Sequence, residues 1–177
     1  MIILCIQAIL NLRFTERIRT AIIVANATIC EEDTVMPALM HNISAIYRCS
    51  ATYRQGVLSP LGLKPFHAAY LISICKNPGI TQDQLAKRIF VDKSNVTRQV
   101  SFLEEAGFVE RRVSPCDRRV MQVFPTQKAE DALPLVRKSF RDWEALVAAD
   151  LTEQEKELLI GILEKMKQRA AQWMEED

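Results

Sequence analysis

Glycine and histidine are scarce in this chain of 177 residues, which contains five glycines and two histidines. The glycines form neither a G-x-G-x-x-G loop nor a G-x-x-x-x-G-K-S/T loop, so nucleotide-phosphate sites of those kinds are not expected. There is no H-E-x-x-H or C-x-x-C motif and no close His/Cys cluster, so the sequence predicts no metal site. A G-x-S-x-G nucleophile elbow is also missing. These absences indicate a protein that is not an enzyme and needs no cofactor.

The five cysteines are scattered along the chain, at positions 5, 30, 49, 75 and 116. Because no secretory signal is evident, reduced thiols and a cytoplasmic location are the simplest interpretation. The apolar start MIILCIQAIL is too short to span a bilayer and has no basic region before it. We therefore expect no membrane partner.

Charge is nearly balanced, with a formal net charge of +1, which by itself does not indicate a nucleic-acid partner. For a contact with a DNA groove, however, local placement matters more than the total. Basic groups favour the first two thirds of the chain, whereas residues 125–177 are acidic. Four arginines stand close together in the middle of the chain, at Arg111, Arg112, Arg118 and Arg119.

Two short helical patterns follow one another over residues 81–107. Thr81-Gln82-Asp83-Gln84 has the T-x-x-Q form of a capping box and opens the first helix. Asp92 can cap the second helix, and Gly107 can end it, because glycine adopts the left-handed conformation at no steric cost. The short separation between the two patterns is typical of two helices that cross steeply.

The second of these helices has an apolar side and a hydrogen-bonding side. Val96, Val100 and Leu103 fall together when the chain advances about 100° per residue. The opposite side suits base contacts, because arginine bonds bidentately to guanine, asparagine to adenine, and hydroxyl groups to several partners. A merely solvated polar face is the alternative. The residues predicted to contact DNA, with Gln82 on a phosphate, are Gln82, Lys93, Ser94, Asn95, Thr97 and Arg98.

A β-hairpin is predicted after Gly107. β-Branched and other apolar residues lie on both sides of the turn sequence Ser114-Pro115-Cys116-Asp117. Arginines at the end of a thin ribbon can reach phosphates or enter a narrow minor groove. We expect Arg118 and Arg119 to do so, with Asp117 holding the guanidinium of Arg119 through a charge-assisted hydrogen bond.

The stretch from Leu85 to Val120 resembles the MarR-type family of bacterial transcription regulators, the multiple-antibiotic-resistance regulators. The shared motifs are D-K-S-x-V-T-R at Asp92–Arg98, L-E-E-x-G-x-V-x-R at Leu103–Arg111 and D-x-R at Asp117–Arg119. The resemblance implies a mainly α fold with a small β-hairpin wing, in which a winged helix-turn-helix lobe joins N- and C-terminal dimerisation helices. It also implies a homodimer on a pseudo-palindromic double-stranded DNA operator, usually repressing, and often released by a small phenolic or lipophilic ligand or by oxidation.

The helical patterns on both sides of the lobe fit the same organisation. The expected divisions are an N-terminal extension of uncertain structure over 1–35, a dimerisation helix over 36–60, the DNA-binding domain over 61–125 and C-terminal dimerisation helices over 126–177. Thr126 can cap the first C-terminal helix, and Thr152–Glu155 forms a T-x-x-E capping box for the last one. Apolar surface on the terminal helices is expected to pack against a second subunit, and core packing within one chain is the alternative.

The resemblance also places an effector between the dimerisation helices and the winged lobe. The aromatic and polar residues predicted to line this site are Tyr47, Arg48, Phe66, His67 and Tyr70.

Two other functions stay open. A thiol switch on the same fold would use Cys49, which has an arginine and tyrosines near it in sequence. Relatives that sense organic hydroperoxides carry their cysteine at a position equivalent to the neighbourhood of Met40, which disfavours this function. A winged-helix protein-interaction module without DNA binding would expose apolar anchors, whereas the second helix exposes polar groups.

Overall fold

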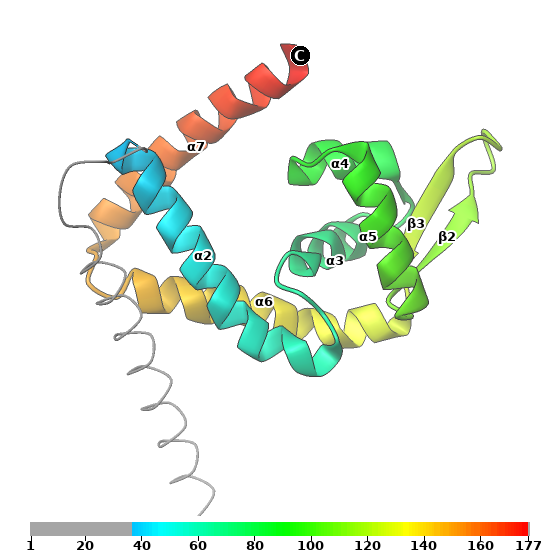
Figure 1. Cartoon of the computed structure of the whole chain (residues 1–177), viewed down its shortest axis with the longest axis horizontal. Helices are drawn as coiled ribbons and strands as arrows, with labels where there is room; N and C mark the ends of the chain where they lie inside the picture. Colours follow the sequence, from blue (N-terminus) through cyan, green and yellow to red (C-terminus); the bar gives the residue numbers. More distant parts are fainter. Residues whose placement is uncertain (1–36, 177) are drawn as a thin grey trace, which may run out of the picture. The chain divides into compact units, whose positions relative to one another are not determined.

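The computed structural model describes residues 37–176, so the expected extension over residues 1–35 lies outside the described part. The chain divides into two compact units, residues 1–43 and residues 44–177. The fold is mainly α with a small antiparallel sheet, as the sequence predicts. The elements in chain order (Figure 1) are α2 (Ala38–Leu58), η1 (Ser59–Leu61), α3 (His67–Lys76), β1 (Ile80–Thr81), α4 (Gln82–Ile89), α5 (Lys93–Glu105), β2 (Val109–Val113), β3 (Met121–Pro125), α6 (Gln127–Val147) and α7 (Glu153–Glu176).

The antiparallel sheet has the strand order β1-β3-β2. The hairpin of β2 and β3 is the one that the sequence predicts, and it places Arg111 opposite Val123. On the other side of β3, Ile80 of β1 pairs with the same Val123. The sequence does not predict β1, because two residues are too few to show the alternation by which a strand is recognised.

The helix α5 ends at Gly107, as predicted, and the local geometry explains why glycine stands there. Gly107 has φ +76°, in the left-handed region. The N–H of Phe108 donates to the carbonyl of Leu103 at 2.8 Å, and the N–H of Gly107 donates to the carbonyl of Glu104 at 2.9 Å. These two bonds form a Schellman motif, which ends the helix and turns the chain toward β2.

One apolar core lies beneath the helix-turn-helix and the sheet. The stripe predicted on the second helix is buried in it, together with side chains from α3, α4 and the strands. The residues that are at most 1 % exposed include Leu71, Ile74, Leu85, Val96, Val100, Leu103, Phe108 and Val123. Helix α6 extends this core along α3 through Ala129, Ala132 and Val136.

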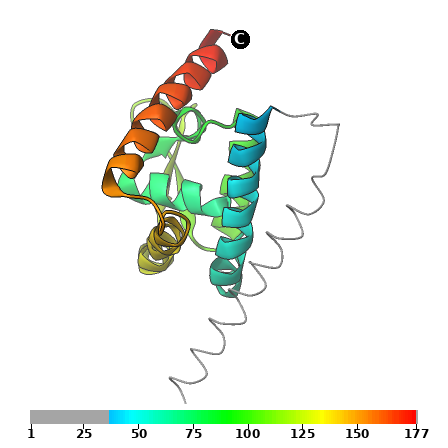
Figure 2. The same cartoon turned by 90° about the vertical axis from the view of Figure 1, so that its left-hand side faces the viewer.

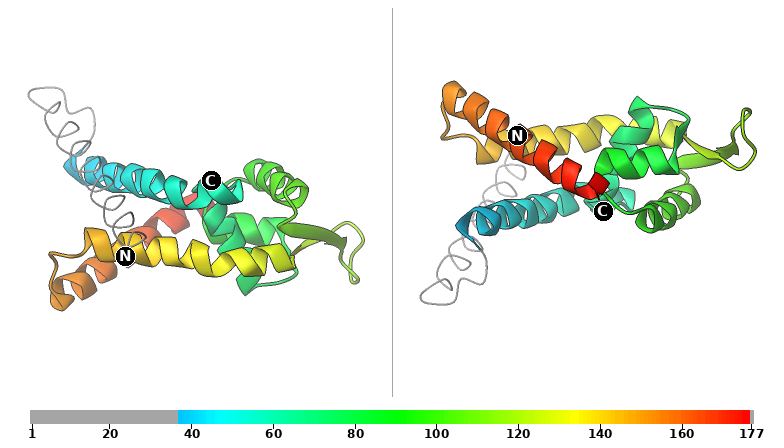
Figure 3. Two further views of the ribbon diagram at one scale, coloured as in Figure 1. Left: turned by 90° about the horizontal axis from the view of Figure 1, so that it is seen from below. Right: turned by 90° about the horizontal axis from the view of Figure 1, so that it is seen from above.

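The second half of α2 packs against α6 (Figure 3). The rings of Tyr53 and Trp143 are 5.6 Å apart, and the guanidinium of Arg54 lies 4.4 Å from the ring centre of Phe140. Arg54 is only 6 % exposed, and it donates to oxygens within α2 and to the carbonyl of Pro65. Its buried charge is therefore satisfied by hydrogen bonds to oxygen and by the aromatic face.

Helix α6 begins after Thr126, as predicted, but the hydroxyl of Thr126 does not cap it. Thr126 Oγ1 instead donates to the carbonyl oxygens of Gly107 at 2.7 Å and Phe108 at 3.0 Å. The expectation of a side-chain cap was wrong because the carbonyl oxygens of the two residues that follow the end of α5 lie within reach of this hydroxyl, which donates to them instead. Thr126 therefore connects the start of α6 to the end of α5.

Helix α7 begins with the predicted capping box. The hydroxyl of Thr152 accepts from the N–H of Glu155 at 3.3 Å, and the Glu155 carboxylate accepts from the N–H of Thr152 at 2.8 Å. Helix α7 then starts beside the end of α6 and runs away from it at a steep angle (Figure 2). Seven of its large apolar side chains are between 43 % and 65 % exposed in the single chain: Leu158, Leu159, Ile160, Ile162, Leu163, Trp173 and Met174.

Gly107→Ala is expected to lower the free energy of unfolding by about 1–2 kcal/mol, because alanine in the left-handed conformation brings Cβ too close to a carbonyl oxygen. A Cβ at this position would meet only Lys128 Cδ, at 3.9 Å, so the cost arises in the backbone and not from a clash. Asparagine tolerates the conformation, so Gly107→Asn should cost distinctly less. Urea unfolding of both full-length variants measures the difference, and equal losses would contradict a backbone origin.

Candidate nucleic-acid interface

Helices α4 and α5 form the helix-turn-helix, and local sequence sets the ends of both. Thr81 Oγ1 accepts from the N–H of Gln84 at 3.2 Å, and Gln84 Oε1 accepts from the N–H of Thr81 at 3.0 Å, which completes the predicted capping box. Helix α4 ends at Phe90, whose φ of +56° is the one positive value at a non-glycine residue between 37 and 176. A bulky residue rarely adopts this conformation, so the turn between the helices carries backbone strain.

The N-terminus of α5 is organised by Asp92. Its carboxylate accepts from the N–H of Asn95 at 2.7 Å, which confirms the predicted cap, and also from the hydroxyl of Ser94. The hydrogen bonds from Ser94 and from the Asn95 backbone lower the pKa of Asp92. Because the proton of Ser94 points at Asp92, the Ser94 oxygen is left to accept a hydrogen bond from a partner.

The outward side of α5 carries most of the residues that the sequence predicts as DNA contacts. The four exposed ones are Lys93, Ser94, Thr97 and Arg98. Asn95 is half-buried on the side of α3, where its Oδ1 lies 3.5 Å from the hydroxyl of Tyr70. Asn95 is therefore oriented by the protein, whereas Arg98 extends from the middle of the exposed face.

Two polar contacts connect α4 to α5 beside this face. Thr97 Oγ1 donates to Gln82 Oε1 at 2.9 Å, and Lys93 Nζ lies 2.7 Å from Asp83 Oδ1. The amide NH2 of Gln82 remains a donor suited to a phosphate. Asp83 was missed at the sequence level, because pairing it with Lys93 requires knowing how the two helices cross. Both charged side chains are more than 60 % exposed, so this ion pair is screened by water and weak.

The tip of the wing presents two exposed arginines, Arg118 and Arg119. Asp117 Oδ1 accepts from the backbone N–H of Arg119 at 2.9 Å, so its carboxylate shapes the turn. We expected it to hold the guanidinium of Arg119, and this was wrong, because the backbone N–H two residues ahead lies nearer to a short carboxylate in a tight turn.

The other two arginines of the wing, Arg111 and Arg112, form contacts within the lobe. Arg111 Nε donates to the carboxylate of Glu104 at 2.9 Å, and this contact with the guanidinium lowers the pKa of Glu104. Arg112 pairs with Glu110, and its guanidinium lies 4.6 Å from the ring centre of Phe124. The pair of Arg111 and Glu104 joins the wing to the C-terminal half of α5.

A small pocket of about 170 Å³ lies between the helix-turn-helix and the wing. It brings together three residues that the sequence predicts as DNA contacts, Gln82, Lys93 and Arg119. Its other lining residues are Thr81, Asp83, Val120 and Met121. The pocket therefore places two cationic side chains, the Asp83 carboxylate and a helix N-terminus around one space. Because Lys93 is paired with Asp83, Arg119 and the helix N-terminus are the groups best suited to an anion.

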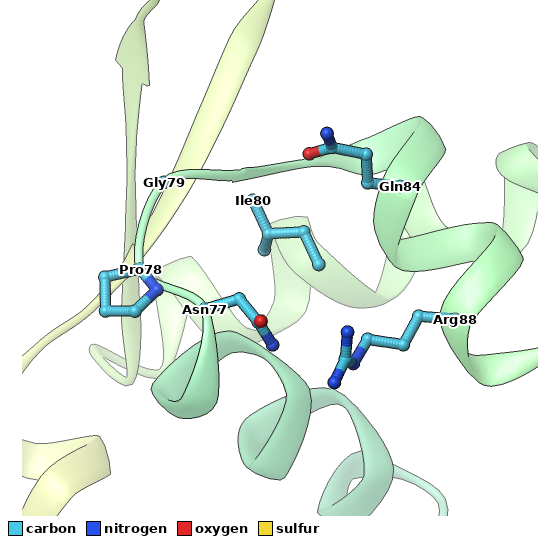
Figure 4. A pocket seen from close by; sticks show the side chains of 6 residues that line it. All are labelled: Asn77, Pro78, Gly79, Ile80, Gln84 and Arg88. Carbon is cyan, nitrogen blue, oxygen red and sulfur yellow. The ribbon is translucent and has the colours of Figure 1, made fainter.

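A larger pocket of about 370 Å³ lies where α3 ends, β1 passes and α4 begins (Figure 4). In Figure 4 the side chains of Asn77 and Arg88 extend toward each other below Ile80. None of its six lining residues is among the predicted DNA or effector contacts.

The five residues predicted to line an effector site do not share one environment. Tyr47 and Arg48 on α2 and Phe66 before α3 are exposed, whereas His67 and Tyr70 are 1 % and 3 % exposed. The buried pair makes polar contacts with α5, through His67 Nε2 to Gln99 and the Tyr70 hydroxyl to Asn95.

The described cysteines and acidic residues show no further site. Cys49 and Cys75 are half-buried, and burial raises the pKa of Cys75, while Cys116 is exposed at the wing. Between residues 37 and 176 no group of three or more His, Cys, Asp or Glu side chains is placed to hold a metal. In the same part of the chain, no helix has the length and apolar character needed to cross a bilayer.

Comparison with known proteins gives a consistent result. A model of the MarR family matches residues 61–120. The transcriptional regulator BilQ of Clostridioides difficile is 30 % identical over 115 residues, which cover 65 % of this chain and 78 % of that protein. The crystal structure of MarR matches with a TM-score of 0.71 and 32 % identity, and the match covers 84 % of this chain and 100 % of that chain. The chain belongs to the MarR family of transcriptional regulators.

Another solved MarR-family member, from Listeria monocytogenes, was crystallised in complex with a 26mer DNA. It matches with a TM-score of 0.73 and 26 % identity over 77 % of this chain and 91 % of that chain. The family model ends at Val120, so the region it matches in this MarR-family chain runs from η1 to the end of the wing turn.

Acidification is expected to destabilise the protein through His67. Burial lowers the pKa of His67, and the Lys64 ammonium acts in the same direction. As the pH falls below about 6.5, the unfolded chain therefore takes up a proton that the folded chain does not. The contribution of His67 to stability is fully present above about pH 6.5 and is lost progressively as the pH falls below that value, through the lowered pKa of the folded state. Thermal unfolding of the full-length protein measures this loss.

His67→Gln is the control for this pH dependence, because it removes the titrating ring and leaves His41 and every carboxylate in place. Its unfolding temperature should fall less than that of the wild type between about pH 7.5 and about pH 5.5. The same fall in both proteins would show that other groups cause the acid destabilisation.

Proposed function

We propose that this chain is a sequence-specific DNA-binding regulator that acts as a homodimeric repressor on a pseudo-palindromic operator. The observation that carries the proposal is the convergence of Gln82, Lys93 and Arg119 on one pocket beside the exposed face of α5. Groups of this kind, arranged on a helix N-terminus, a recognition helix and a wing, suit the backbone and grooves of duplex DNA.

In this proposal α5 lies in the major groove. Arg98 extends from the middle of the exposed face and can bond bidentately to the O6 and N7 atoms of a guanine. The Ser94 oxygen, whose proton is donated to Asp92, suits the amino group of cytosine or adenine. These two residues are therefore expected to contribute sequence preference.

The wing contributes a different contact. Arg118 and Arg119 are exposed at its tip, while Arg111 and Arg112 are engaged in ion pairs with Glu104 and Glu110. Arginines on a narrow ribbon suit the enhanced negative potential of a narrow minor groove. The low net charge of the chain does not oppose this, because the cations that matter are concentrated at the interface.

Exposed apolar side chains support the homodimer. Seven large ones lie on α7, and Ile46 and Tyr47 on α2 are 55 % and 62 % exposed. Apolar surface on this scale is costly to expose to water and marks an interaction site. A two-fold dimer would place two copies of α5 about one helical turn of DNA apart.

The proposal includes an effector that releases the DNA. Tyr47, Arg48 and Phe66 offer exposed aromatic and cationic groups, whereas His67 and Tyr70 already contact α5. A phenolic ligand would have to bind the conformation that is unsuited to DNA more tightly than the other one. Regulation through Cys49 is an alternative on the same fold, and its half-buried thiol is supported by no specific contact.

Arg98→Ala is expected to cost about 1–3 kcal/mol of specific DNA binding, concentrated at one base position. The probe is the duplex that the wild-type protein enriches from a random pool, compared with a scrambled duplex of the same composition. Arg141→Ala, which removes an equal charge from the exposed surface of α6, is the control and should leave binding unchanged. Equal loss on both duplexes would show that Arg98 contacts only the backbone, and binding that is insensitive to salt would favour a protein-interaction module.

Leu159→Asp is expected to shift the protein from dimer to monomer, because it places a charge within the exposed apolar surface of α7. Sedimentation velocity of the full-length protein measures the oligomeric state. The monomer can contact only one half-site, so operator affinity should fall on the order of tenfold or more. Gln168→Asp adds the same charge at an exposed polar position of α7, and a similar dissociation by this control would contradict the assignment.

A further inference from the structure

Helix α3 contacts the recognition helix through polar side chains as well as through the core. His67 Nε2 lies 3.2 Å from Gln99 Oε1, and the Tyr70 hydroxyl lies 3.5 Å from Asn95 Oδ1. His67 and Tyr70 are one turn apart on α3, and Asn95 and Gln99 are one turn apart on α5. The two contacts therefore form a matched pair along the line where the helices meet.

The hydrogen bonds of His67 determine which ring nitrogen carries the proton. The backbone N–H of Lys64 donates to His67 Nδ1 at 3.1 Å, so Nδ1 has no proton in the neutral ring. Nε2 is then the N–H group, and it donates to Gln99. Because only an oxygen can accept this bond, the amide of Gln99 is held with Oε1 toward His67 and its NH2 away from it.

The ring of His67 has little freedom to move. It is 1 % exposed, lies nearly parallel to the ring of Phe102 with centroids 4.6 Å apart, and meets Phe66 edge-on at 4.4 Å. A buried N–H directed at a single acceptor is costly to leave unpaired. The position of Gln99 is therefore coupled to that of His67.

Polar contacts hold α5 on both flanks of its buried stripe. At about 100° per residue, Asn95 and Gln99 lie on the flank facing α3, while Lys93 and Thr97 lie on the flank facing α4. Ser94 and Arg98 fall between these flanks on the outer side. The two valines and the leucine of the buried stripe form no hydrogen bond, so the directional contacts that help to fix the rotation of α5 about its axis lie at the flanks.

We propose that His67 is a positioning residue for DNA recognition, which sets the rotation of α5 through Gln99, with Tyr70 acting in the same way through Asn95. This role rests on the proposed DNA-binding function and adds to it two residues that need not touch DNA. A rotated α5 would still present cations to phosphates, but Ser94 and Arg98 would no longer meet base edges at the required angle. Sequence preference therefore depends on these contacts more than total affinity does.

A pair of substitutions at His67 separates its two hydrogen bonds. His67→Gln places an amide NH2 near the position of Nε2 and can still donate to Gln99, while it loses the acceptor for Lys64. His67→Asn places an oxygen near Nδ1 and can still accept from Lys64, while it loses the donor to Gln99. Both remove the ring, so a purely structural role predicts similar defects in the two variants.

The measurement is the affinity of each full-length variant for the enriched duplex and for its scrambled counterpart. His67→Asn is expected to lower affinity for the enriched duplex on the order of tenfold and to leave the scrambled duplex nearly unchanged, whereas His67→Gln should stay within about threefold of the wild type on both. Equal losses in the two variants, or a loss shared by both duplexes, would overturn the proposal.

Gln99→Met tests the same bond from α5, because it removes the amide at this half-buried position and keeps a side chain of similar length. It should weaken binding to the enriched duplex as His67→Asn does, and the double variant should lose no more than the larger single loss, because both remove one interaction. Full additivity would overturn the proposal. If the wild-type protein enriches no duplex, the proposed DNA-binding function is wrong. If the wild type binds and the His67→Asn and Gln99→Met variants bind the enriched duplex equally well, only this inference is wrong.

Discussion

The burial of one stripe of α5 is the constraint from which the rest of the lobe follows. Val96, Val100 and Leu103 are completely buried, and this requires α3, α4 and the sheet to surround a helix that must still leave one side open. The capping by Asp92 and the Schellman motif at Gly107 define where that helix starts and stops. Its open side consequently has a fixed length and faces away from every neighbouring element of the lobe.

Arginines in the wing have two separate uses. The pair of Arg111 with Glu104 connects β2 to α5, and Arg112 lies over Phe124 beside the sheet, so both contribute to the rigidity of the hairpin. Arg118 and Arg119 are left at its end, where the turn is shaped by Asp117. A ribbon fixed in this way, with two long exposed cationic side chains at its tip, can meet a phosphate backbone without losing its own structure.

Much of the fold can be read from the sequence because its signals are local. The capping boxes at Thr81 and Thr152, the cap at Asp92 and the left-handed Gly107 each depend on residues within one turn, and all four were predicted correctly. The strand β1 could not be predicted from two residues. The true partners of Thr126 and Asp83 lie in other segments, so only the crossing of α4 and α5 and the approach of residues 107 and 108 to the start of α6 reveal them.

In the candidate site, too, some features could be predicted from the sequence and others could not. Exposed residues on α5 and at the wing tip follow from helical periodicity and turn chemistry, and the structure brings three of the predicted contacts around one small pocket. The tautomer of His67 and the orientation of Gln99 could not be predicted from the sequence. They are set by the backbone N–H of Lys64 and by the packing of α3 against α5. Amino-acid composition and local patterns do not predict a hydrogen bond between two helices.

The fastening of α6 to the end of α5 has a mechanical consequence. Thr126 donates to the carbonyls of Gly107 and Phe108, and Lys128 Nζ donates to the carbonyl of Ala106 at 2.7 Å, so the first turn of α6 grips the three residues at which α5 stops. A shift of α6 along its own axis would therefore displace the C-terminal end of α5. In the proposed dimer, a displacement of α6 at the subunit interface would thus reach the end of α5 through these hydrogen bonds and through the core that α6 shares with α3.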